Sequence, residues 1–91
     1  MSGVLLHKLC TSSAPKDKDT CHAYILGVID TVVAEEKELK RNLVCMPPAL
    51  DAQKAVDVAI RYLQQNPAER PYVAATTVSV ALFEAYPCRK R

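Results

Sequence analysis

The spacing of hydrophobic residues along the chain predicts helices. Between residues 19 and 38, apolar side chains recur at the i, i+3, i+4 and i+7 spacing of one helix face. The helix should begin near Asp19 or Thr20, with a side-chain cap from Asp17, Asp19 or Thr20. Its apolar positions are Cys21, Tyr24, Ile25, Val28, Ile29, Val32 and Val33.

Two further segments are predicted on either side of this helix. Residues 4–10 make a short apolar stretch of about two helical turns, and the polar, breaker-rich residues 11–20 after it predict a loop. Asp51 is a good N-cap for the third helix in the chain, which should end near Asn66 and Pro67. The apolar stripe of this helix is expected to contain Ala52, Ala55, Val56, Ala59, Ile60 and Leu63.

A last helix should follow Pro71, which suits a first helical position, and end at Pro87. Pro47-Pro48 should break the chain before the third helix. The pattern therefore predicts an all-α bundle of three main helices and a short N-terminal helix, in one domain over residues 1–91. The last helix should bury Ala74, Val78, Ala81, Leu82 and Ala85, with Thr76, Thr77 and Ser79 elsewhere and Glu84 exposed.

Four cysteines in a chain of 91 residues indicate an oxidising compartment, because domains of this size often need staples. Cys10 ends the first helix and Cys21 opens the second, while Cys45 precedes the third and Cys88 follows the fourth. We therefore expect the disulfides Cys10–Cys21 and Cys45–Cys88. In the loop-entropy model these bridges contribute about 3 and about 4 kcal/mol.

The stretch "CHAYILGVID", residues 21–30, sets a cysteine beside a histidine, and three roles are open to the pair. Neighbours on a helix point about 100° apart, so Cys21 and His22 do not face each other as a catalytic pair must. A zinc site needs more than the two histidines of this chain. We favour a structural disulfide over catalysis or metal binding, and we expect neither a cofactor nor enzyme activity. Gly27 predicts close approach of another helix, and Asp30 is expected to be exposed.

Charge and hydropathy argue against two kinds of partner. A formal net charge of +2 is too small to favour nucleic acid, and no basic stripe is interleaved with aromatic residues. The cluster Arg89–Arg91 is expected to be a solvated tail. No apolar run reaches the roughly 18–20 residues of a membrane span. The N-terminus does not have the pattern of a signal peptide, so we expect that a native leader has been removed and Met1 added.

Taken in order, several motifs resemble those of the Rap/Tai-type immunity proteins, the periplasmic antidotes to type VI secretion amidase effectors. The motifs are "CHAYILGVID", the "VCMPP" turn and "AVDVAIRYLQQNPAERPYVAATTVSVALFEAYPC", and together they span residues 21–88. The resemblance implies a helical, disulfide-bonded periplasmic protein made with a cleavable leader, and a homodimer. It also implies a partner, a secreted peptidoglycan amidase whose Cys–His active site the antidote blocks.

A plug for an enzyme cleft needs an exposed, preorganised, polar projection. The segment "QQNPAERP", residues 64–71, is stiffened by two prolines, so we expect Gln64, Gln65, Asn66, Glu69 and Arg70 to contact the toxin. The segment "EEKELKRN", residues 35–42, is a second candidate, with Glu35, Glu36 and Lys40 as its contact residues. A helix face is the remaining alternative.

One competing function fits the size and the cysteines. A small periplasmic chaperone of the acid-stress type would unfold in part at low pH and expose an apolar surface. Two disulfides and few carboxylates in the predicted core argue against such an acid switch.

Overall fold

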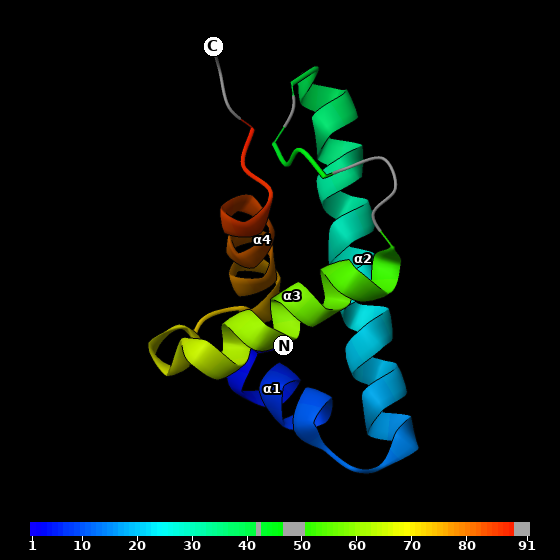
Figure 1. Ribbon diagram of the computed structural model, residues 1–91, viewed down its shortest axis with the longest axis vertical. Coiled ribbons are helices and arrows are strands. Elements are labelled where there is room, and N and C mark those ends of the chain that lie inside the picture. The colour runs from blue at the N-terminus through cyan, green and yellow to red at the C-terminus, as the bar shows by residue number, and fades with distance from the viewer. Residues whose placement is uncertain (42, 47–50, 89–91) are drawn as a thin grey trace.

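The computed structural model describes residues 1–41, 43–46 and 51–88, and its regular elements are helical. The predicted break at Pro47-Pro48 and the tail Arg89–Arg91 lie outside these residues. Helices α2 and α4 stand side by side, α3 crosses them and α1 packs at the lower end (Figure 1). The predicted all-α class is confirmed. The elements are α1 (Gly3–Thr11), α2 (Pro15–Leu39), α3 (Ala52–Gln65), η1 (Pro67–Glu69, a 3-10 turn) and α4 (Ala74–Ala85).

The core lies where the four helices meet, and each helix contributes to it. Helix α2 has 25 residues and is about 37 Å long, close to the 42 Å longest dimension of the molecule. Val33, predicted to be buried, is 39% exposed although Val32 beside it is 3% exposed, because neighbouring positions of a helix point about 100° apart. The largest fully buried side chains are Leu6, Ile25, Val56, Leu63, Thr77, Val78 and Leu82.

Three burial predictions at the helices α3 and α4 were wrong. Ala52 and Ala85 are exposed because they occupy the first position of α3 and the last position of α4. Thr77, placed outside the buried face by its polarity, is only 2% exposed. Its hydroxyl donates to the Glu69 carbonyl at 3.2 Å, so the polar group is satisfied inside the core.

The predicted start of the second helix was also wrong, because α2 begins at Pro15 and the predicted loop shrinks to a short turn. Pro15 occupies the first turn, where a missing N–H costs nothing. The Ser12 hydroxyl accepts from the Ala14 N–H at 3.1 Å and donates to the Asp17 carboxylate at 2.8 Å. This pair fixes the turn, and Asp17 lies in the first turn of the helix rather than at its cap.

The predicted start of the last helix at Pro71 was also wrong, because the helix begins three residues later than predicted. Helix α4 begins at Ala74, because the chain before it bonds to the N-terminal segment. The Gly3 N–H donates to the Tyr72 carbonyl at 2.8 Å, and the Ala74 N–H donates to the Met1 carbonyl at 2.9 Å. An antiparallel bridge thus joins Ser2 to Val73 and holds Val73 extended.

Both predicted disulfides are present, and the described chain has no free cysteine. Cys10 and Cys21 are 8% and 2% exposed, so their bridge lies in the core. Cys45 is exposed and Cys88 half-buried, and the Cys45 N–H donates to the Tyr86 carbonyl at 2.9 Å. The second bridge therefore ties the end of α4 to residues 43–46 at the surface.

This difference in exposure predicts the order in which the bridges are reduced. Thiolate attack needs access to a sulfur, so graded dithiothreitol should open Cys45–Cys88 before Cys10–Cys21. Alkylation followed by peptide mass spectrometry should show label on Cys45 and Cys88 first. Labelling of all four cysteines in a single step would contradict the prediction.

The N-terminal bridge gives a second prediction. A β-carbon placed on Gly3 would lie 2.6 Å from the Arg70 carbonyl oxygen, a backbone atom that has little room to move. Gly3→Ala should therefore lower the free energy of unfolding by about 1–3 kcal/mol. Gly27→Ala is the matched control, because a β-carbon there meets nothing within 4 Å, and it should raise stability. Equal melting temperatures for the two variants would contradict this account.

Candidate binding surface

The predicted segment 64–71 comprises Gln64 and Gln65 at the end of α3, then η1 and the turn that follows it. This 64–71 loop is held by its own side chains. The Arg70 guanidinium donates from Nε to the Leu63 carbonyl at 2.7 Å and from Nη2 to the Gln64 carbonyl at 3.0 Å. The Asn66 side chain donates to the Tyr62 carbonyl at 2.9 Å. The Tyr62 carbonyl also accepts from the Asn66 backbone N–H at 3.0 Å. The two Arg70 donors satisfy carbonyls at the end of α3, and the positive charge suits the negative end of the helix dipole.

Contacts from the rest of the protein hold the same loop from outside. The Val4 N–H donates to the Arg70 carbonyl at 2.8 Å, and Thr77 in α4 bonds to the Glu69 carbonyl. Within the loop, η1 closes a turn in which the Glu69 N–H donates to the Asn66 carbonyl at 2.9 Å. The loop is therefore preorganised by α1, α3 and α4, and not by its two prolines alone.

The five predicted contact residues of this loop do not all present free side chains. Gln64 and Gln65 are exposed, and Glu69 is half-buried. Asn66 and Arg70 are also half-buried, and both side chains are already bonded to the end of α3. The loop as the structure has it offers Gln64, Gln65 and Glu69 to a partner.

The second predicted segment is the last part of α2, and it is helical as far as Leu39. The Glu36 carboxylate accepts from the Leu43 and Val44 N–H groups at 2.9 and 2.8 Å, so it anchors the chain after the helix. Lys40 adopts a left-handed conformation at the C-cap, with φ 53°. Glu35 and Lys40 are exposed, and Asn42 lies outside the described residues.

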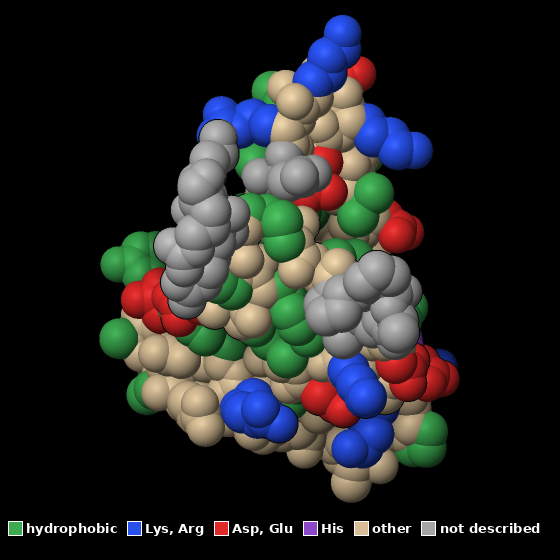
Figure 2. Space-filling model, turned by 45° about the horizontal axis from the view of Figure 1, so that its top comes forward, with side chains coloured by type: hydrophobic (Ala, Val, Ile, Leu, Met, Phe, Trp, Pro, Cys, Tyr) green, Lys and Arg blue, Asp and Glu red, His purple; other side chains and the backbone are tan. Residues whose placement is uncertain are grey.

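The two predicted regions lie at different ends of the molecule. In Figure 1 the 64–71 loop projects at the lower left, whereas α2 ends at the top. Figure 2 shows Lys and Arg side chains gathered at that upper end, where Lys37, Lys40 and Arg41 are exposed. The two regions do not form a single patch of adjacent residues.

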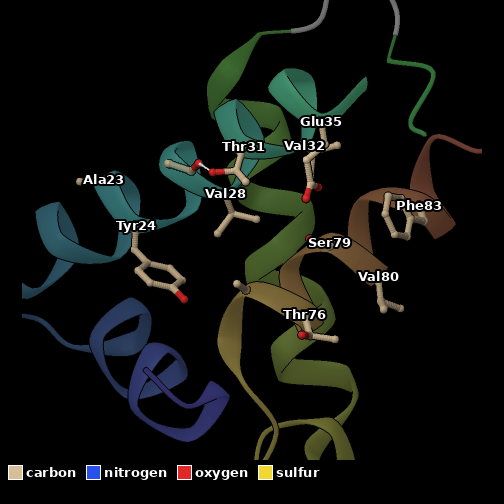
Figure 3. A pocket seen from close by; sticks show the side chains of 12 residues that line it. Ala23, Tyr24, Val28, Thr31, Val32, Glu35, Thr76, Ser79, Val80 and Phe83 are labelled. Atoms are coloured by element: carbon tan, nitrogen blue, oxygen red, sulfur yellow. Dashed lines mark hydrogen bonds between the residues drawn. The ribbon is translucent and has the colours of Figure 1, made fainter. Parts of the chain in front are cut away.

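A groove between α2 and α4 lies between them, and it was not predicted from the sequence. It encloses about 680 Å³. In Figure 3, α2 carries Val28, Val32 and Glu35 along the groove, and α4 carries Thr76, Ser79 and Phe83. Ala23, Gly27 and Thr31 of α2 and Ala75 and Val80 of α4 complete this α2–α4 groove, with Tyr24 at its lower end.

Gly27 lines this groove and does not meet another helix, which corrects the predicted close approach. A β-carbon on Gly27 has open space on all sides to 4 Å. Glycine inside a helix costs about 1 kcal/mol relative to alanine. The packing of this chain therefore gives no reason for the glycine. Asp30, three residues further along α2, is exposed as expected.

The groove continues toward the 64–71 loop. A smaller hollow is lined by Glu69, Tyr72, Val73 and Thr77, and it shares Thr76 and Val80 with the groove. Glu35, the first residue of the second predicted segment, lies at the other end of the groove. One partner laid along this surface would touch both regions predicted from the sequence.

Two chemistries considered from the sequence, a metal site and a reactive thiol, are not formed by the described residues. Among the described residues, no three His, Cys, Asp or Glu side chains gather in a way that could hold a metal ion. Cys21 is bridged to Cys10, so the Cys21–His22 pair has no thiol to activate. Within the described part of the chain, no helix has the length and apolar character needed to cross a membrane.

Comparison with known proteins identifies the class. The chain is a small helical protein held by two disulfides, and its surfaces suit the recognition of another protein. The family model of the Rap1a immunity proteins matches residues 2–88, and the chain belongs to this family. No curated protein matches the chain. The family supports an immunity function exerted by binding a partner effector, which is a non-enzymatic role, and the disulfides indicate an oxidising compartment outside the cytoplasm.

The titratable side chain of His7 lies close enough to Arg70 of the 64–71 loop to feel its charge. His7 of α1 is half-buried, and its pKa is lowered below the ordinary value of 6.5 by burial and by the charge of Arg70. In the pH range between the lowered value and 6.5, the unfolded chain binds more protons at this site than the folded chain. The contribution of His7 to stability is therefore complete above about pH 6.5 and declines as the pH falls.

The pH dependence of unfolding should reveal this contribution. Between pH 7.5 and 5, the wild-type protein should lose stability partly through His7, and His7→Gln should remove that part of the loss. Urea unfolding at each pH measures it, with His22→Gln as the control. Identical slopes of stability against pH for wild type and His7→Gln would show that the site does not contribute.

Proposed function

We propose that this protein is the periplasmic antidote to a type VI secreted peptidoglycan amidase, and that the 64–71 loop plugs the Cys–His cleft of the toxin. Membership of the Rap1a immunity family supports the proposal, and so does the braced geometry of the loop. A segment already fixed by hydrogen bonds loses little conformational entropy on binding. Glu69, Gln64 and Gln65 present polar groups to such a cleft.

The same proposal includes a homodimer as the active form and names Glu35, Glu36 and Lys40 as secondary contacts. Glu36 also anchors Leu43 and Val44, so its loss should disturb the fold as well as binding. The family membership favours this function over an acid-stress chaperone. Sedimentation of the purified protein at several concentrations measures the oligomeric state directly.

The first experiment is a titration of this protein into a peptidoglycan-hydrolysis assay run by the amidase encoded beside it. Complete inhibition near a one-to-one ratio of chains is the expected result. A folded, fully oxidised protein that leaves hydrolysis unchanged at tenfold excess would overturn the proposal.

Variants of the loop then distinguish residues that contact the toxin from residues that hold the loop in place. Glu69→Ala should weaken inhibition at least about tenfold, as loss of a central interface contact does, with an unchanged melting temperature. Asp30→Ala removes the same charge from an exposed site on α2 and should inhibit like wild type. Arg70→Ala should lower both affinity and melting temperature, because it uncaps α3. Full inhibition by Glu69→Ala at equal stoichiometry would contradict the loop model.

A further inference from the structure

The α2–α4 groove has a glycine that the fold does not need. Because a β-carbon on Gly27 would contact nothing in the chain, an alanine there would favour the helix at no steric cost. The glycine is useful only if something outside the chain approaches the α2 backbone at this point. The groove is therefore shaped for a partner.

The row of small residues in the groove has the dimensions of a helix contact. Ala23, Gly27 and Thr31 follow one another at four-residue spacing along α2, and rows of this spacing receive the ridges of a packed helix. From residue 23 to residue 35 the row is about 18 Å long. The Thr31 hydroxyl already donates to the Gly27 carbonyl at 2.9 Å (Figure 3), so it does not need a polar partner.

The opposite wall of the groove is uncharged. Helix α4 contains one charged residue, Glu84, and Glu84 does not line the groove. Phe83 on the groove is 38% exposed, and Val73 just before the helix is 59% exposed. The groove wall of α4 therefore mixes apolar Ala75, Val80 and Phe83 with the uncharged Thr76 and Ser79. A surface without charged groups and with an exposed aromatic side chain is typical of the centre of a protein interface.

The charges at the two ends of this surface indicate the chemistry of the partner. Among the described residues lining the groove and the adjoining hollow, the charged side chains are Glu35 and Glu69, without a Lys or Arg. The whole chain nevertheless has a net charge of +2. A second copy docked groove to groove would bring the same carboxylates against this surface, and like charges across an interface are unfavourable. A partner with basic residues is complementary.

We propose that the α2–α4 groove binds a helical segment of the amidase effector that has a small apolar face and Lys or Arg residues near its ends. This inference rests on the proposed function and adds a second contact to it. The 64–71 loop enters the catalytic cleft, while the groove holds the body of the toxin. Glu35 then contacts the toxin at the upper end of the groove. Glu69 takes part in both the loop contact and the groove contact.

The open space at Gly27 allows the groove to be blocked without disturbing the fold. Gly27→Leu places a side chain in the groove and should melt no lower than wild type, because leucine is a better helix former than glycine. Calorimetric titration with the amidase encoded beside this protein should show binding at least about tenfold weaker than wild type. Ala34→Leu, at an exposed α2 position outside the groove, should bind like wild type.

Charge reversal tests the chemistry assigned to the partner. Glu35→Lys should lower the association rate, and the loss should shrink as salt is added. Asp30→Lys makes the same change on α2 away from the groove and should leave the rate near that of wild type. Equal slowing by both variants would contradict a specific role for Glu35.

The outcomes separate this inference from the proposed function. If wild type and Gly27→Leu bind the amidase equally while Glu69→Ala binds weakly, the groove proposal is overturned and the loop model stands. If wild type does not bind the amidase, both are overturned. If Gly27→Leu sediments as a smaller species than wild type, the groove holds a second copy of this chain, which also overturns the proposal.

Discussion

The backbone hydrogen bonds between residues 1–4 and residues 70–74 are the constraint on which the other parts of the structure depend. They hold Val73 extended and so decide where α4 begins. They seat α1 against the 64–71 loop at a distance that only a glycine at position 3 allows. Because Arg70 takes part in this contact through its carbonyl and caps α3 through its side chain, one residue links α1 to α3.

The parts of the fold that the sequence predicts well are those set by short-range chemistry. Asp51 caps α3 and Pro67 follows its end, because both effects act within a few residues. The disulfide pairing follows from the order of the elements. Pro15 and Pro71 were assigned the wrong roles because a proline fits both a helix start and an extended turn. The choice at Pro71 depends on Met1 and Gly3, which lie about seventy residues away in the chain.

The candidate site shows the same difference between what short-range patterns predict and what depends on distant parts of the chain. The prolines of the 64–71 loop marked it as a projection, but the sequence does not tell a contact residue from a cap. Arg70, Asn66 and Glu36 were expected to face the partner, and their side chains hold backbone groups of this chain. The groove left two traces in the sequence, an unexplained Gly27 and a last helix with a single charge. Gly27 was attributed to packing inside the molecule, because sequence alone does not show which helix faces remain uncovered. The single charge of the last helix was not interpreted.

The arrangement of the two disulfides has a consequence for how the protein is made. Each bridge joins cysteines that are neighbours in chain order, Cys10 with Cys21 and Cys45 with Cys88. An oxidase that pairs thiols in the order in which they emerge from an export channel therefore produces the native connectivity directly. Disulfide reshuffling, which takes seconds to hours, is then unnecessary, and a newly exported molecule matures without waiting for an isomerase.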